Sequence, residues 1–384
     1  MDITFPELVF LAVVLSRLLV PLLIIRFPLP AIVACLVIDA VDQTVFQAIA
    51  PDADLSGYQS YDKALDIYYL VIAYTATLRN WTNQFAVEVA RFLIFYRLVG
   101  VVLFELSEVR GILFIFPNTF EYFFIFYESV RLFWDPRRMS RRVIIGATAF
   151  IWIFIKLPQE WWIHIAQLDT TDLVQETIFG VPAGTPWLDT FAARPWIVVL
   201  AVVAAAAAAY AIYWLMKHKL PPRDRPLTID ADAEPGRAVP PERLAAVHSR
   251  LMRRILGTSL LEKYALIALV STIFGKMLQV EAGVVELAVL IGVVVVANAA
   301  LSTWLARYGF GPGPALRQFI VTGLLNVGIV AVMLLVNLFG DATDPGRLAF
   351  FVLLITLLVT LYDRYRPEYL ARFDRSDTAP AVGT

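Results

Sequence analysis

The sequence predicts an all-α fold, a polytopic transmembrane helical bundle of about 11 spans. Of the 384 residues, 59% are hydrophobic and 17% are charged, whereas roughly 25% of the residues of an ordinary soluble domain are charged. The mean hydropathy is +0.69. Several windows reach the roughly 20 apolar residues that cross a bilayer as a helix. We therefore expect a multi-pass integral protein of the cell membrane.

The apolar windows place the expected spans near residues 8–25, 30–49, 62–79, 82–106, 112–134, 143–160, 195–216, 259–279, 283–306, 315–338 and 346–363. Basic residues give the orientation, because cytoplasmic loops carry an excess of Lys and Arg. The four arginines between 137 and 142 and the segment 217–225 are therefore expected inside. This predicts an N-terminus outside and a C-terminus in the cytoplasm.

Composition divides the chain into four regions. Residues 1–216 form a polar transmembrane module, and 217–257 a cytoplasmic Pro-rich linker with a basic amphipathic helix expected on anionic headgroups. Residues 258–365 form an apolar transmembrane module, and 366–384 a disordered cytoplasmic tail. The apolar module carries Asn298 and Asn326 as isolated polar points. A homo- or hetero-oligomer could assemble through it.

Composition also excludes several classes of site. Cys35 is the single cysteine, which excludes an intrachain disulfide and a multi-thiolate metal site. The three histidines are too few and too scattered for a zinc or haem centre. The net charge of −1 gives no reason to expect a nucleic-acid partner. The first residues lack the basic leader of a cleaved signal peptide, so we expect the first span to be retained.

Four aspartates lie in or beside the second and third spans, where a carboxylate at the bilayer centre costs about 2.5–3.5 kcal/mol. If these spans form an antiparallel hairpin, Asp39 is level with Asp66 and Asp42 is level with Asp62. Hard oxygen ligands gathered in this way favour Mg²⁺, Mn²⁺ or Ca²⁺, and we expect Mg²⁺ or Mn²⁺ bound by Asp39, Asp42, Asp62 and Asp66. Two other interpretations of Asp62 stay open. It could begin a helix at the membrane–water interface, or it could form an ion pair with Lys63.

Arg17 lies at the middle of the first span and level with Asp39. It could neutralise Asp39 alone, or present its guanidinium to a phosphate beside the metal. The four aspartates with Arg17 leave a charge of −3, which a divalent cation would compensate. Polar side chains near the quartet could hydrogen-bond a sugar or a phosphate; these are Gln43, Gln47, Tyr58, Gln59 and Tyr61.

The fourth and fifth spans carry six further charges. At equal depth in a hairpin they form pairs of opposite sign, which are Glu88 with Arg131, Arg91 with Glu128, and Arg97 with Glu121. Pairing across a hairpin offsets the cost of a charge in hydrocarbon, so the pattern favours a structural ion-pair ladder. A substrate-binding role for Arg91 or Arg97 is the alternative. Pro117 and Asn118 predict a kink in the fifth span.

The stretch between Asp39 and Asp66 reads DAVDQTVFQ and then YQSYDKALD. It resembles a degenerate form of the signature D-x2-D-G-x2-A-R-x8-G-x3-D-x3-D of the CDP-alcohol phosphotransferases. That family carries its aspartates on the second and third of six helices and binds two metal ions. The resemblance implies that Asp39, Asp42 and Asp62 hold metal and that Asp66 deprotonates an acceptor hydroxyl group or shares the metals. Gln43 and Tyr58 replace the two glycines and Phe46-Gln47 replaces Ala-Arg, so the residues for the cytidine nucleotide are missing.

These residues support three functions. The first is a metal-dependent transferase or phosphohydrolase in the membrane, acting on a phosphorylated lipid with Arg17 on the phosphate and Asp66 as base. The second is a cation- or proton-coupled transporter or channel that uses the same carboxylates. The third is a non-catalytic subunit of a membrane complex.

Overall fold

The structure is a computed structural model that describes residues 5–49, 58–168, 170–219, 221–253, 258–277, 292–294, 296–298, 300, 315–335 and 345–373. Every regular element in these residues is a helix, as the sequence predicts. Four helical stretches are long and apolar enough to cross a membrane, namely Leu8–Ile25, Arg141–Ile165, Pro195–Leu215 and Gly346–Phe373. Helical class and membrane location are thus supported by length and composition.

Seven expected spans fall outside this set, for different reasons. Those near 30–49 and 315–338 are represented only by the shorter apolar stretches Pro28–Val41 and Arg317–Val332, and the one near 112–134 is divided into two shorter helices. The segments near 62–79, 82–106 and 259–279 are helical, but charged residues are scattered along them. Most of the segment expected at 283–306 lies outside the described residues.

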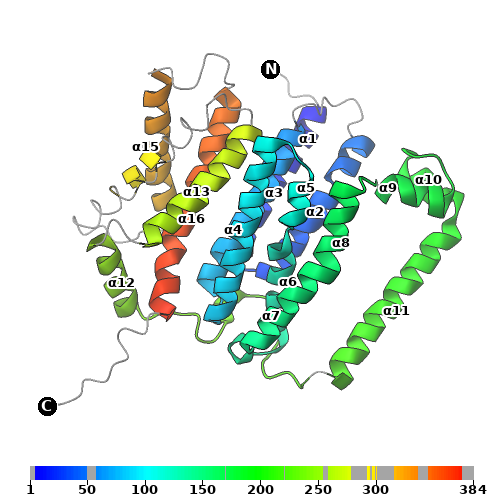
Figure 1. The fold of residues 1–384 in the computed structure, drawn as a ribbon, viewed down its shortest axis with the longest axis horizontal. Coiled ribbons are helices and arrows are strands. Elements are labelled where there is room, and N and C mark those ends of the chain that lie inside the picture. The colour runs from blue at the N-terminus through cyan, green and yellow to red at the C-terminus, as the bar shows by residue number, and fades with distance from the viewer. Residues whose placement is uncertain are drawn as a thin grey trace.

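The centre of the molecule is α3 (Tyr58–Asn80), whose residues from Ala64 to Leu78 are almost all buried. It packs against α16 (Pro345–Phe373), α4 (Gln84–Ser107) and α2 (Pro28–Ile49). Figure 1 shows α3, α4 and α16 side by side in the middle of the bundle. The first span contains α1 (Phe5–Leu19) and the 3₁₀ turn η1 (Val20–Ile25), which has Pro21 near its start.

The predicted kink of the fifth span is present. The helix α5 (Gly111–Ile115) ends before Pro117, and α6 (Thr119–Phe133) begins after it. Proline supplies no amide hydrogen and disfavours a helical conformation at the residue before it. Phe116 accordingly leaves the helix with φ −107° and ψ 65°. A Cβ placed on Gly100 of α4 would lie 2.1 Å from the Cβ of Phe116, so only glycine permits this approach.

A continuous helical stretch from Arg141 to Ile165 contains two π-helical turns. It consists of α7 (Arg141–Phe150), η3 (Ile151–Lys156), α8 (Leu157–Glu160) and η4 (Trp161–Ile165). Pro158 lies at the start of α8 and lacks an amide hydrogen, which disrupts the α-helical pattern there. Such π turns occur frequently at functional sites.

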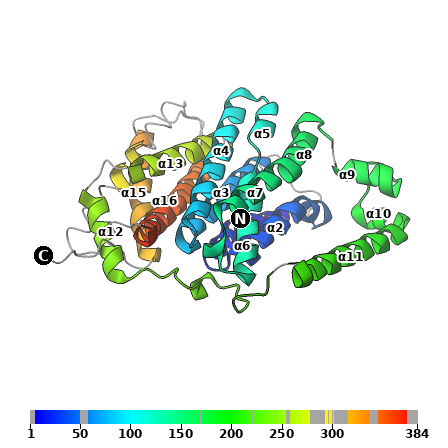
Figure 2. The ribbon, with the colours of Figure 1, turned by 60° about the horizontal axis from the view of Figure 1, so that its bottom comes forward.

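The helix α11 (Pro195–Lys219) stands at the edge of the molecule, beyond the short elements α9 (Thr170–Leu173), η5 (Val174–Phe179) and α10 (Trp187–Ala193). Figures 1 and 2 both show it apart from the bundle. Its apolar side chains are open on nearly every side; Val199 and Val202 are 62% and 63% exposed. A 25-residue apolar helix of this kind is suited to lipid and not to water.

Residues 221–240, here called the strap, connect α11 to α12 (Pro241–Arg253) and run along the lower edge of Figure 2. The sequence predicts only a polar linker, but the strap makes specific contacts at the end of the bundle where α3 ends. The Ala231 amide donates to the Arg26 carbonyl at 2.8 Å. Asp232 pairs with Arg79 at 2.6 Å. Two 3₁₀ turns, η2 (Pro136–Arg138) and η6 (Ala231–Ala233), lie in this region.

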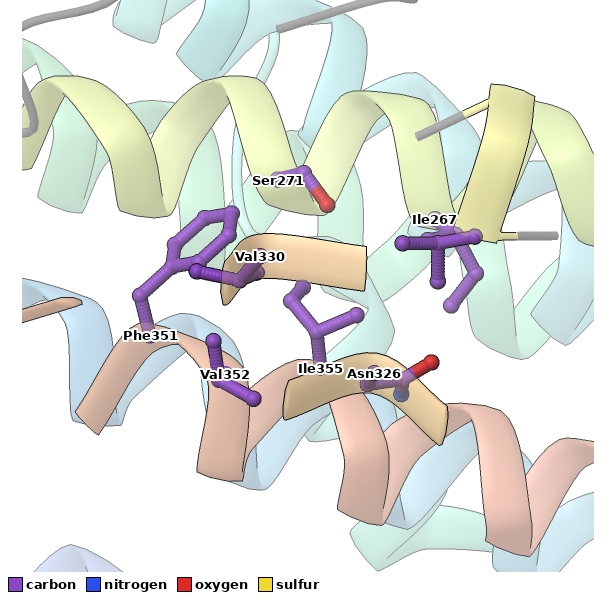
Figure 3. A pocket seen from close by; sticks show the side chains of 8 residues that line it. Ile267, Ser271, Asn326, Val330, Phe351, Val352 and Ile355 are labelled. Carbon is purple, nitrogen blue, oxygen red and sulfur yellow. The ribbon is translucent and has the colours of Figure 1, made fainter. Parts of the chain in front are cut away.

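The second half contains α13 (Thr258–Met277), α15 (Ala315–Leu335) and α16. Asn298 and Asn326 are hydrogen-bonded to each other at 2.8 Å, and Asn326 donates to Thr356 at 3.0 Å. They are therefore partners and not isolated points. A small cavity of about 20 Å³ lies beside Asn326, between side chains of α13, α15 and α16 (Figure 3).

The expectation of a disordered tail from residue 366 is wrong for its first part, because α16 continues as a helix to Phe373. Arg372 explains this extension. Its guanidinium donates to the carbonyls of Leu78, Arg79 and Trp81, at 3.3, 2.5 and 2.8 Å. It thereby satisfies the carbonyl groups left unpaired at the C-terminal end of α3. Residues 374–384 lie outside the described residues.

Candidate functional site

Arg17 is the centre of the predicted site. Its Nη2 donates to Asp39 Oδ1 at 2.7 Å and also pairs with Asp66 Oδ1. The Arg17 side chain is 4% exposed, whereas the two carboxylates are 37% and 39% exposed. Three helices, α1, α2 and α3, thus bring one buried cation and two accessible acids together. The equal-depth prediction for Arg17, Asp39 and Asp66 agrees with these contacts.

A cavity of about 10 Å³ lies beside Arg17, with walls formed by Val20, Pro21, Cys35, Ile38, Leu65 and Tyr69. Its size is close to that of one water molecule. The Tyr68 hydroxyl donates to the Leu18 carbonyl at 3.1 Å, which fixes α3 against the end of α1. The buried guanidinium therefore faces a small polar space at the junction of the first three helices.

The rest of the predicted quartet lies on the same two helices. Asp42, Gln43 and Gln47 belong to α2, and Tyr58, Gln59, Tyr61 and Asp62 belong to α3, but their side chains lie outside the part that the structure describes. Among the described side chains, no three His, Cys, Asp or Glu residues gather as a metal site would require. Mg²⁺ often uses only one or two carboxylates together with phosphate oxygens. Asp39 and Asp66 fit that smaller set.

The predicted ion-pair ladder is wrong, because all six residues have other surroundings. Arg131 pairs with Glu128 of its own helix at 2.6 Å, and its Nη1 lies 3.8 Å from Glu234 of the strap. Glu88 is exposed and accepts a hydrogen bond from Gln84. Equal depth fixes the height of a residue but not its direction around the helix axis, which turns by about 100° per residue.

The two arginines proposed for substrate binding have separate environments. Arg91 pairs with Glu262 of α13 at 3.3 Å. Arg97 donates to the Phe116 carbonyl at 2.9 Å and lies 3.9 Å from Glu160. Arg91 makes no described contact with the Arg17 site, whereas Arg97 is linked to it only indirectly, through Glu160.

A second buried polar network adjoins Arg17, and the sequence interpretation missed most of it. Tyr69, which lines the Arg17 cavity, donates to Glu121 at 2.9 Å. Asn118 then links two acids. Its side-chain Nδ2 donates to Glu121 at 2.8 Å, and its backbone N–H donates to Glu160 at 3.0 Å. His164 Nε2 lies 3.0 Å from Glu160. The network runs from α3 through α6 to the helix with the π turns.

The missed residues carry a recognisable signal. Lys156, Glu160 and His164 recur every four residues in an otherwise apolar span, so they share one face of the helix. The Lys156 ammonium group lies 4.1 Å from the centre of the Tyr122 ring. Lys156 and Glu160 are both buried. Charged residues with this spacing in a span indicate a face that points into the bundle.

The opposite end of the bundle, at the strap, is closed by aromatic packing and ion pairs. Trp81 stacks on Tyr127 with ring centres 3.8 Å apart, and its Nε1 donates to Glu128 at 2.7 Å. Glu234 of the strap is fully buried and pairs with Arg225 at 2.7 Å. Arg17 and its network therefore lie in the half of the bundle away from this sealed end.

Two carboxyl groups at the strap have perturbed acidity. Asp230 accepts hydrogen bonds from Arg26 at 3.0 and 3.1 Å, which holds the pKa of this carboxyl below its ordinary value of 3.8. Asp135 accepts hydrogen bonds from Arg137, and the pKa of Asp135 is lowered for the same reason. Both groups stay ionised and hold the strap at neutral pH.

No protein-family model matches the chain, and neither curated proteins nor solved structures gave a match.

Proposed function

We propose that the protein is a membrane-embedded, metal-dependent transferase or phosphohydrolase that acts on a phosphorylated lipid. The observation that carries the proposal is the position of Arg17, which is buried and shared by Asp39 and Asp66 of two different helices. Two accessible acids around one guanidinium suit the binding of a cation and a phosphate side by side.

The chemistry follows from an exchange of partners. Asp39 and Asp66, with Asp42 and Asp62, would hold Mg²⁺ or Mn²⁺, which would supply charge neutralisation for phosphate oxygens. Arg17 would leave the carboxylates and clamp the phosphate with its planar fork. Asp66, released from Arg17, would accept the proton of the attacking hydroxyl group or share the metal, the two roles implied by the resemblance to CDP-alcohol phosphotransferases. The hydroxyl oxygen would form the new bond to phosphorus, and the phosphoester oxygen would leave as its bond to phosphorus breaks.

Metal binding tests the proposal directly. Full-length protein in an uncharged maltoside detergent is titrated with Mg²⁺ and Mn²⁺ while its thermal unfolding is followed by tryptophan fluorescence. We expect the ions to raise the Tm of the wild type and of Asp189→Asn, an exposed control on α10, but not that of Asp42→Asn or Asp66→Asn. An equal rise in all four proteins, or none in any, would contradict the metal site. Mass spectrometry of co-purified lipid then identifies the phosphorylated substrate class.

A second candidate, a proton- or cation-coupled transporter, is favoured by the chain of buried polar groups from Arg17 through Tyr69 and Glu121 to Glu160. Its position argues against passage across the membrane, because both ends lie in the half of the bundle away from the strap. Measuring the flux of protons or cations into proteoliposomes that contain the protein separates the two functions. Uptake that is lost in Glu121→Gln and kept in Asp42→Asn would favour transport.

The finer topology is part of the same proposal. About 11 spans with the N-terminus outside would place Arg17 and its acids toward the outer face and the strap in the cytoplasm. The third function, a non-catalytic subunit assembled through residues 258–365, is less favoured, because α13 and α16 of that region pack within the bundle on α4 and α3.

A further inference from the structure

A second cluster of arginines lies near the end of the bundle that the strap covers. Glu262 of α13 forms an ion pair with each of two arginines. One of its carboxylate oxygens lies 3.3 Å from Arg91 of α4, and the other lies 2.5 Å from Arg366 of α16. Tyr74 of α3 also donates to Glu262, at 2.7 Å. Four helices therefore converge on one carboxylate.

The donors of this cluster exceed its acceptors. Arg91 Nη2, Arg366 Nε and Nη1, and the Tyr362 hydroxyl are buried without a hydrogen-bond partner among the described residues. The Arg366 side chain is only 8% exposed. A buried donor that lacks a partner costs about 1–3 kcal/mol, and more for a charged group. Four such donors in one place are a strong indication of an acceptor that binds there.

The geometry and charge of the cluster define that acceptor. Both guanidinium groups lie near the Tyr369 ring, with Arg91 at 5.3 Å and Arg366 at 4.8 Å from its centre. Tyr362, Arg366 and Tyr369 occupy one face of α16, because they are four and three residues apart. Two arginines against one glutamate leave a net charge of +1. The neighbouring Lys263 does not change this balance, because it pairs with Asp363 at 2.8 Å.

We propose that Arg91, Arg366 and Tyr362 form a binding site for a phosphate-type oxyanion. Guanidinium forks and a hydroxyl group match the geometry and charge of phosphate oxygens. Arg91 is 27% exposed and provides the access to the site. The site is separate from Arg17, because Tyr74 lies eight residues, or about 12 Å, along α3 from Asp66. Lipid headgroups and free phosphate share the chemistry that the site recognises.

Anion-dependent stability tests this site. Full-length protein in maltoside detergent is unfolded by heat with inorganic phosphate replacing chloride at constant ionic strength. A second series adds phosphatidic acid, with diacylglycerol as the phosphate-free counterpart. We expect one of the two phosphates to raise the Tm of the wild type. Stabilisation by phosphatidic acid alone identifies a lipid headgroup as the source, and stabilisation by inorganic phosphate identifies the free ion; either supports the site.

Variants assign the effect to the cluster. Arg366→Gln should weaken the apparent affinity by about tenfold or more, because a charge-assisted hydrogen bond is lost. Tyr362→Phe should weaken it while leaving the anion-free Tm unchanged or higher, because a buried hydroxyl without a partner is removed. Lys263→Gln is the matched control, because it removes one positive charge from the residue next to Glu262. This variant should keep the rise in Tm that phosphate causes.

Two results would overturn the site. One is a wild type that neither phosphate stabilises. The other is a response in Tyr362→Phe and Arg366→Gln equal to that of Lys263→Gln. Tyr362→Phe decides the matter if Arg366→Gln fails to fold. Arg17→Gln should keep the anion response, so that failure of this site and failure of the Arg17 site are distinguished.

Discussion

Arg17 shows how a single buried charge orders its neighbours. Its guanidinium is enclosed by the bundle, while the acids that neutralise it, Asp39 and Asp66, reach the surface. Without these acids the buried arginine would be strongly unfavourable in an apolar environment. The contact therefore fixes the relative height of α1, α2 and α3 and keeps two carboxylates close together.

Replacement of Arg17 should be destabilising in a measurable way. Arg17→Gln removes the shared cation and leaves two neighbouring carboxylates to repel each other, so we expect a loss of about 2 kcal/mol in the free energy of unfolding. Denaturant unfolding in detergent measures it. Arg110→Gln, on the exposed loop between α4 and α5, should change stability by less than about 0.5 kcal/mol. Equal effects of the two substitutions would show that the Arg17 contacts carry no stability.

The pairing of residues at equal depth in a hairpin agrees with the contacts of Arg17 but not with those of the arginines of α4, and there is one physical reason for the difference. Residues at equal depth in a hairpin share a height, which is sufficient where the two helices face each other directly. Arg91 faces α13, an element about 170 residues further along the chain. No hairpin rule places that helix, so the partner Glu262 could not be predicted. The roles of Asp42 and Asp62 stay predictions.

At the scale of elements, the close approach of α4 to the break between α5 and α6 depends on Gly100. The Phe116 Cβ occupies the space that any side chain at position 100 would need. Phe116 also presents its carbonyl to Arg97 at 2.9 Å. The packing of two helices and the position of one arginine thus depend on the same glycine.

Gly100→Ala should therefore destabilise the protein. We expect a loss of about 1–3 kcal/mol, because an added methyl group must displace a backbone-attached atom. Gly146→Ala is the matched control, since nothing lies within 4 Å of a Cβ at that helical position. It should be neutral or stabilising by up to about 1 kcal/mol. Thermal unfolding of both variants compares them, and a Gly100→Ala protein as stable as Gly146→Ala would contradict the packing argument.

The strap gives a pH dependence whose sign can be worked out. The pKa values of Asp230 and Asp135 are lower in the folded protein than the ordinary 3.8. Their contribution to stability is thus complete above that value and is lost as the pH falls through the folded pKa. The amides of residues 224–237 should lose protection against hydrogen exchange, measured relative to the intrinsic exchange rate at each pH, on acidification below pH 3.8. In Asp230→Asn the exchange of residues near 230 should already be faster at neutral pH. Protection that stays constant as the pH falls would contradict this role of the two carboxylates.

At the scale of the whole molecule, apolar side chains cover much of the outside, while several charged side chains are buried, among them Arg17, Glu128 and Arg131. Leu8, Leu11, Leu15, Leu19 and Leu23 are all exposed along the first span, and α11 is exposed on nearly all sides. Water would penalise such a surface, whereas lipid does not. The helical membrane class could be predicted from composition alone. The number of spans could not, because charged helices such as α4 are retained by partners that only the tertiary structure provides.

Cysteine labelling tests the proposed orientation. Cys35 is the single cysteine and is buried, so Cys35→Ser gives a background without thiols. Arg223→Cys in the strap should react with an impermeant maleimide only after the membrane is opened. Asp189→Cys on α10 should react in intact cells. The reverse pattern would place the strap outside and invert the topology.

Arg372 has a consequence for biosynthesis. It completes a helix end that the ribosome produced 291 residues earlier, at Trp81. Until translation reaches that arginine, the carbonyl groups at the end of α3 lack this partner, and the nascent chain carries an unfinished helix terminus in the membrane. A chain truncated before residue 372 should consequently be recognised by quality-control proteases even though every residue of α3 has been synthesised.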